Sequence, residues 1–179
     1  MIPQKVYEHL NSYWQRSKDA FKSKDYPIAA FFAITLIEEI GKIVILGKEK
    51  IEAKLDKKAF RDHRKKYIYA VYSAILVNSR ITRIYGDFES KFAFWFKEKR
   101  LFSIRNSALY LEKVGKKITI PLEAVSKQDA FLLVCIAGEV LAEIQGDFTG
   151  SGPKEWRYFI NQVDVFRKTF GKECGLNSE

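Results

Sequence analysis

Two glutamates and a lysine interrupt residues 27–46, which are otherwise almost entirely apolar. Glu38 and Lys42 are four residues apart, so on a helix they share one face in the order that favours an ion pair. Glu39 lies on a neighbouring face and can meet a second partner. Gly41 lowers helix propensity by about 1 kcal/mol relative to alanine, so we expect it to allow close approach of another helix. Because a buried charge is costly unless it is paired, the segment predicts either a polar site inside a bundle or a surface stripe with a helix-stabilising ion pair.

A histidine opens the second polar segment, Asp62–Lys66. His63 and Lys66 are three residues apart and fall on the same face of a helix. Because imidazole gains and loses a proton near neutral pH, His63 could act as a general acid or base. The alternative is the basic start of a surface helix. His9 has no polar neighbours of this kind, and we interpret it as structural or exposed.

The third polar segment is Arg105-Asn106, followed by Tyr110, among mostly apolar neighbours. An arginine in such surroundings must find a carboxylate or a phosphate. Glu38 or Glu39 would be a natural partner if the two helices pack together. The arginine would then either belong to a site or form a buried ion pair that holds two helices in register.

Other kinds of site find little support in the sequence. Two isolated histidines cannot supply a zinc ligand set, and no HExxH or paired ExxH motif is present. The chain has no phosphate-cradling glycine loop, and no serine or cysteine stands beside a histidine in a recognisable nucleophile motif. We therefore expect no metal and no cofactor.

Helical periodicity predicts the elements that must position these residues. The predicted helices cover residues 5–22, 27–46, 60–85, 89–99, 126–146 and 155–170, with a further long element through Arg105 and Tyr110. Gly47 fits a C-terminal cap and Ser126 an N-terminal cap. Residues 115–121 are typical of a loop with one short extended stretch. With only four prolines and ten glycines, the chain is predicted to be all-α, a bundle of about five or six helices.

The length of 179 residues suits one domain. We expect residues 1–148 to form the bundle, 149–153 a linker, and 154–179 a helix packed on the same domain with a loose tail.

The net charge of +9 suggests a polyanionic partner, or simply solubility. Cys135 lies in an apolar run and predicts a buried thiol. Because no signal-peptide pattern or membrane-length apolar stretch is visible, we expect a soluble, cytoplasmic protein without membrane association.

The three polar segments also match a known pattern in order and spacing. The run from Tyr26 to Lys42 ends in the letters EEIGK. His63 and Lys66 follow as an H-x-x-K segment, and Arg105 through Tyr110 follow as R-x-x-x-L-Y. Together these segments resemble the AbiV family of abortive-infection proteins, which belongs to the HEPN helical domains.

The resemblance covers roughly residues 11–144 and implies a HEPN-like bundle that dimerises and blocks phage propagation by shutting down translation. Many HEPN proteins are metal-independent endoribonucleases, whose site is an arginine with a polar residue after it and, after four to six intervening residues, a histidine. Arg105 and Asn106 fit the first half, whereas Tyr110 and its two successors occupy the positions expected for the histidine. His63 could supply the imidazole if its helix packs beside Arg105.

Three functions from different classes follow. The first is an RNase-like toxin acting on tRNA, mRNA or the ribosome and triggered by a phage-encoded protein. Its expected catalytic residues are His63, Arg105, Glu38, Glu39 and Lys42, and its expected substrate-binding residues are Lys66, Asn106 and Tyr110. The second is a non-catalytic module that binds RNA, ribosomes or a phage protein, with the polar cluster serving as a structural ion-pair network. The third is a helical partner of a separate toxin or nucleotidyltransferase. A homodimer is compatible with each.

Overall fold

The computed structural model describes residues 3–52, 57–72, 80, 84–85, 95, 98, 100–115, 117–148 and 153–176. In chain order its elements are α1 (Gln4–Lys22), α2 (Tyr26–Glu52), α3 (Lys57–Arg61), α4 (His63–Tyr72), α7 (Arg100–Ser107), β1 (Glu112–Val114), β2 (Lys117–Thr119), α8 (Pro121–Ala124), α9 (Lys127–Phe148), α10 (Pro153–Phe170) and a 3-10 helix (Lys172–Cys174). Within these residues six helices have eight residues or more. The predicted all-α fold with five or six main helices is confirmed.

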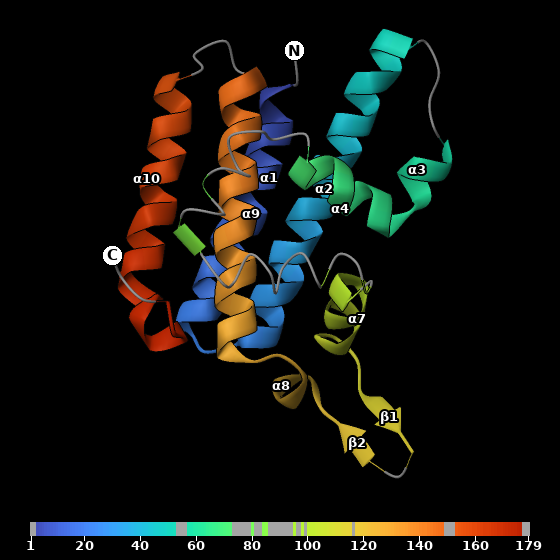
Figure 1. The fold of residues 1–179 in the computed structure, drawn as a ribbon, viewed down its shortest axis with the longest axis vertical. Coiled ribbons are helices and arrows are strands. Elements are labelled where there is room, and N and C mark those ends of the chain that lie inside the picture. The colour runs from blue at the N-terminus through green and yellow to red at the C-terminus, as the bar shows by residue number, and fades with distance from the viewer. Residues whose placement is uncertain are drawn as a thin grey trace.

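Four long helices form the body of the molecule (Figure 1). α9 packs against α1, α2 and α10, and α1 also packs against α2. α4 and α7 both pack on α2. The β1–β2 hairpin projects beyond one end of the bundle. α2 therefore connects the core of the bundle to the two helices that carry His63 and Arg105.

α2 and α9 occupy the centre because they are apolar on almost every side, as expected of a helix surrounded by others. Every residue from 130 to 145 is buried. Trp14 of α1 reaches α9, where its indole N–H donates to the Val134 carbonyl at 3.1 Å. Gly138 makes room for the ring, since a Cβ there would lie 2.7 Å from the Trp14 Nε1. The contact fixes α1 against the middle of α9.

Several local predictions are confirmed. Ser126 caps α9, because its Oγ accepts the Asp129 backbone N–H at 3.0 Å. Cys135 is fully buried in the same helix. α1 and α10 begin and end within two residues of the predicted limits.

Two predicted helix limits near the site are wrong. α2 does not end at a glycine cap but continues through Gly47. The helix predicted over 60–85 begins instead at His63, after the separate short α3. Asp62 causes the break, because its Oδ1 accepts the Lys65 backbone N–H at 3.2 Å in an N-cap hydrogen bond. This cap places His63 in the first turn of α4.

The segment after α7 also differs from the prediction. The long element expected through Arg105 and Tyr110 ends at Ser107. Instead of one extended stretch, β1 and β2 form an antiparallel hairpin. Gly115 stands at the turn with a φ of +63°, a conformation that favours glycine. The hairpin separates α7 from α8 and α9.

The chain beyond α10 is more closely packed than a loose tail. Residues 172–174 form the 3-10 helix, and the side chains of Cys174 and Leu176 are buried. Of the linker predicted at 149–153, residues 149–152 lie outside the described residues and Pro153 begins α10. Most of the helix predicted at 89–99 also lies outside the described residues. Among the helices that the structure describes, none combines the length and hydropathy that a bilayer crossing requires.

Candidate functional site

Side chains from α2, α4 and α7 converge on the carboxylate of Glu38. Glu38 is only 3% exposed, and its Oε1 accepts a very short hydrogen bond from the Tyr67 hydroxyl. The His63 Nδ1 lies 2.9 Å from the same oxygen, and the Lys66 Nζ lies 3.6 Å from Oε2. The Arg105 Nε lies 3.9 Å from Oε1. Of the predicted site residues, Glu38, His63, Lys66 and Arg105 thus lie together in the structure; we call these four, with Tyr67, the Glu38 cluster.

A glycine allows this convergence. A Cβ on Gly41 would lie 2.0 Å from the backbone carbonyl oxygen of Lys66. The backbones of α2 and α4 thus touch one turn from Glu38, which brings the first turn of α4 over the carboxylate. The close helix approach predicted from Gly41 is confirmed.

The groups of the cluster fill complementary roles. Burial, followed by the charge and the hydrogen bond of Glu38, raises the pKa of Tyr67 far above its ordinary value, so the phenol stays protonated and donates. The His63 Nδ1 is closer to Glu38 than to the Lys66 Nζ, which lies 3.4 Å from it. The shorter contact indicates that Nδ1 donates to the carboxylate, which leaves Nε2 for proton exchange.

Arg105 is held loosely by comparison. Its guanidinium carbon lies 5.7 Å from the centre of the Phe31 ring. Its buried Nε makes no hydrogen bond within the described part of the chain, and 27% of the side chain is exposed. Buried donors normally find an acceptor. Arg105 therefore retains hydrogen-bonding capacity for an anion.

A cavity of about 380 Å³ adjoins the cluster. Its lining residues are Arg61, Asp62, His63, Arg64, Tyr67, Trp95, Leu101 and Phe102. His63 forms the boundary: its ring centre is 5.0 Å from that of Phe102, and its side chain is 37% exposed. A second cavity, of about 410 Å³ between α1 and α10, has none of the site residues in its lining. The imidazole thus connects a sealed carboxylate with an open hollow.

The remaining predicted residues lie apart from Glu38. The Lys42 Nζ pairs with the Glu39 Oε1 at 2.5 Å, and both side chains are 30% exposed. The expected Glu38–Lys42 ion pair is therefore wrong: lysine pairs three residues back rather than four. Asn106 is half-buried on α7. Tyr110 stands beyond the end of α7 and is 65% exposed.

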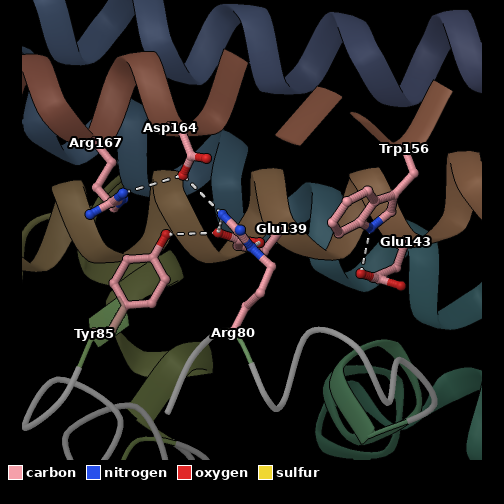
Figure 2. Close-up of polar contacts among 7 residues, drawn as sticks. All are labelled: Arg80, Tyr85, Glu139, Glu143, Trp156, Asp164 and Arg167. Carbon is pink, nitrogen blue, oxygen red and sulfur yellow. Dashed lines mark hydrogen bonds and ion pairs between the residues drawn. The ribbon is translucent and has the colours of Figure 1, made fainter. Parts of the chain in front are cut away.

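A second polar cluster, which the sequence analysis missed, lies between α9 and α10 (Figure 2). The Arg80 Nε and Nη2 donate to the two carboxylate oxygens of Glu139 at 2.8 and 3.2 Å, and Nη2 also donates to Asp164 at 2.9 Å. The Tyr85 hydroxyl donates to Glu139 at 3.2 Å. Arg167 approaches Asp164 at 3.4 Å. We call these residues the Glu139 cluster.

Burial dominates the electrostatics of the Glu139 cluster. Glu139 is fully buried, and burial raises the pKa of its carboxyl although Arg80 acts to lower it. Burial acts to lower the pKa of Arg80, but the hydrogen bonds and charges of Glu139 and Asp164 raise it above its ordinary value. Nearby, Trp156 donates to Glu143 at 2.7 Å (Figure 2). Because Glu139 is fully buried and paired, we interpret this cluster as one that holds the fold together.

A signal for this cluster exists in the sequence. Glu139 and Glu143 are two acidic residues at helical spacing inside the apolar run 130–145. Buried carboxylates require partners, so the run predicts cations or donors elsewhere in the chain without identifying them. Among the described residues, no three His, Cys, Asp or Glu side chains are grouped so that they could hold a metal ion.

No curated protein and no solved structure matches the chain. The HEPN_AbiV family model, described as AbiV, matches residues 2–142. This span contains α1, α2, α4, α7 and most of α9, and with them the whole Glu38 cluster. The chain belongs to the AbiV family of HEPN-type abortive-infection proteins.

Proposed function

We propose that the protein halts phage propagation by cleaving RNA at the Glu38 cluster, without a metal ion, and so shuts down translation. The observation that carries the proposal is the approach of His63 and Arg105 to one oxygen of Glu38 beside an open cavity. An imidazole and a guanidinium side by side supply proton transfer and charge stabilisation, the two needs of phosphodiester cleavage by a neighbouring hydroxyl.

Each residue has a definite task in this proposal. Glu38 holds Nδ1 of His63 and so fixes the tautomer and orientation of the ring, as an acidic residue does for a catalytic histidine in hydrolases. Nε2 of His63 exchanges a proton with the RNA. Arg105, whose side chain is 27% exposed, binds the scissile phosphate through its guanidinium group and stabilises the charge that develops on it. Lys66 is buried against Glu38 and positions the acid rather than touching RNA.

The outer predicted residues have weaker support. Glu39 and Lys42 neutralise each other as a half-buried ion pair on α2, so we expect them to contribute little to RNA attraction and nothing to bond cleavage. Asn106 follows Arg105 on α7 and could contact the same strand. A phage-encoded protein remains the proposed trigger, and tRNA, mRNA or the ribosome the proposed target.

The test is incubation of purified protein with total RNA or tRNA in the presence of EDTA. His63→Ala should reduce the cleavage rate by about 10²–10⁴-fold, and Arg105→Ala by about 10²–10³-fold. His9→Ala and Arg100→Ala are matched controls, because both residues are exposed on the described structure and neither belongs to the cluster. If His63→Ala and Arg105→Ala cleave as well as the controls, the assignment is wrong.

A second function is favoured by the burial of Lys66 and Glu38, which are 4% and 3% exposed. In this alternative the Glu38 cluster is an ion-pair lock between helices, and the basic surface binds RNA, ribosomes or a phage protein. RNA association would then weaken steeply with salt, and no fragments would form under any condition. The same EDTA incubation, with binding measured in parallel, separates the two functions.

A further inference from the structure

The cavity beside His63 has the composition of a nucleotide site. Its volume of about 380 Å³ lies within the range of about 300–1,000 Å³ that small-molecule sites occupy. Trp95 is almost fully buried in its wall, Leu101 is fully buried, and Phe102 is 41% exposed. The hollow is thus walled by aromatic and apolar side chains and open on one side.

The aromatic groups are placed for stacking rather than for closing the core. The rings of His63 and Phe102 are tilted by 45° with their centres 5.0 Å apart. A phenylalanine that lay in the core would be buried, as Phe131 and Phe21 are. Exposed aromatic side chains that line a hollow are the usual platforms on which unpaired bases stack, because every base has a π face.

Positive charge lies at the rim of the same cavity. Arg61 and Arg64 line it from the end of α3 and the start of α4, and both are exposed. Within the part of the chain that the structure describes, neither forms an ion pair with a carboxylate. The lining acid, Asp62, has its Oδ1 occupied by the Lys65 backbone N–H. Cations of this kind, beside stacking rings, match the phosphates that flank a base.

We propose that this cavity binds one unpaired nucleotide, with its base stacked on Phe102 and its flanking phosphates on Arg61 and Arg64. The inference rests on the proposed function in one respect: the nucleotide belongs to an RNA strand whose next phosphodiester lies at His63 and Arg105. The proposed substrate is therefore an RNA strand with one unstacked, unpaired nucleotide. A duplex cannot place a paired base in the hollow.

The test measures binding separately from cleavage. The probe is a fluorescently labelled RNA strand with 2′-O-methyl groups throughout, which cannot be cleaved by attack of a neighbouring hydroxyl. Phe102→Ala and Phe102→Leu should each weaken binding about 5- to 150-fold, as loss of one stacked base does. Phe102→Tyr should retain binding, because it keeps the aromatic face. Tyr158→Ala, which removes an exposed aromatic side chain of α10, is the matched control and should bind as the wild type does.

The rim makes a separate prediction on charge. The double variant Arg61→Ala/Arg64→Ala should make the plot of log binding constant against log salt concentration less steep by about 1.4, since each phosphate contact on a single strand contributes about 0.7. Lys154→Ala/Arg157→Ala, two exposed cations of α10, removes the same charge elsewhere and should leave the affinity for a short strand nearly unchanged. Equal losses in both double variants would mean that only net charge matters and would overturn the site.

Further arms identify the source of the nucleotide. A duplex of the same sequence, and a strand without bases, should bind at least 5-fold more weakly than the intact strand and should not respond to Phe102→Ala. 5′-AMP is then tested as a competitor of the strand. If it displaces the strand at a similar concentration, and only when Phe102 is present, the cavity binds a nucleotide but is assigned to free nucleotides. If Phe102→Ala, with an unchanged unfolding curve, binds the strand as tightly as the wild type, the proposal is overturned. If His63→Ala cleaves RNA normally, the cleavage proposal fails, but the binding results expected here stay the same.

Discussion

Gly41→Ala tests the contact on which the Glu38 cluster depends. On propensity alone, alanine in the middle of a helix stabilises by about 1 kcal/mol relative to glycine. At this position, however, the new Cβ would lie 2.0 Å from the carbonyl oxygen of Lys66 and 2.6 Å from its carbonyl carbon. Contacts below 3.0 Å are essentially never observed, so α4 must retreat by roughly 1 Å. Overpacking of this kind destabilises by about 1–3 kcal/mol, and the net change should be a loss.

Gly47→Ala is the matched control, because it makes the same substitution later in the same helix. A Cβ on Gly47 would meet nothing within 4 Å, so only the propensity gain remains, up to about 1 kcal/mol of added stability. Urea unfolding should therefore give changes of opposite sign for the two variants.

The site should respond more strongly than the fold does. The His63 Nδ1 to Glu38 Oε1 distance is 2.9 Å, and a retreat of about 1 Å removes that hydrogen bond. A displacement of this size can reduce catalysis about 10²-fold, so Gly41→Ala should lose RNA cleavage while Gly47→Ala keeps it. A Gly41→Ala protein that is as stable as Gly47→Ala would show that α2 and α4 do not touch here, and would remove the physical basis of the cluster.

Three further predictions concern buried charge and assembly. Arg80→Met should destabilise the fold by about 3–5 kcal/mol at pH 8, because it leaves the buried Glu139 carboxylate without its partner. Burial already raises the pKa of Glu139, so the stability that its protonated form contributes is present below the ordinary pKa and is lost as pH rises. The loss in unfolding free energy, measured in urea, should therefore shrink toward pH 5, and a loss that does not change with pH would contradict this reasoning. Lys18→Met should stabilise by about 1–2 kcal/mol at pH 7, because burial lowers the pKa of Lys18 from 10.5 to about 8, so that below pH 8 folding buries a charged lysine at a cost. The gain should disappear as pH rises from about 8 to 10.5, and a constant gain would point to packing alone. Light scattering at micromolar concentration should show a dimer, in keeping with exposed apolar side chains such as Leu111 and Leu122, and a monomer alone would count against it.

The sequence predicts the long helices well because their signal is local. Apolar residues at three-to-four spacing locate α1, α9 and α10, and Ser126 gives the start of α9. Strands of three residues carry no usable period, so the β1–β2 hairpin was expected only as a loop with one extended stretch. The cap at Asp62 was missed because it lies in the charged run 61–66, where no apolar period marks a helix limit, and the break depends on one side-chain hydrogen bond.

The candidate site was predictable only as far as its unusual residues stand out. Glu38 is conspicuous because it lies in an apolar helix, and Arg105 because it is another charge in apolar surroundings. His63 and Lys66 stood out by their types and spacing within a charged run, and Tyr67 carried no signal. Which glutamate pairs with Lys42 depends on rotamers, and that prediction failed. The Glu139 cluster was missed because Arg80 is 59 residues away from Glu139 in sequence, and no local pattern reports such a pairing.

The two polar clusters differ in what they can do, and the difference is geometric. Glu139 has both carboxylate oxygens occupied by Arg80, and the paired charges share a sealed space. At Glu38, Oε1 accepts a hydrogen bond from Tyr67 and lies 2.9 Å from the His63 Nδ1, while the Arg105 Nε stands 3.9 Å away, so the guanidinium is not fully neutralised. His63 opens onto a cavity, and Arg105 keeps a buried Nε without an acceptor. An arrangement with incomplete pairing is less stable than a closed one, and it persists most readily where a ligand completes it. An anionic group between His63 and Arg105 would do so, and for that reason the chemistry of this protein is to be sought at Glu38 and not at Glu139.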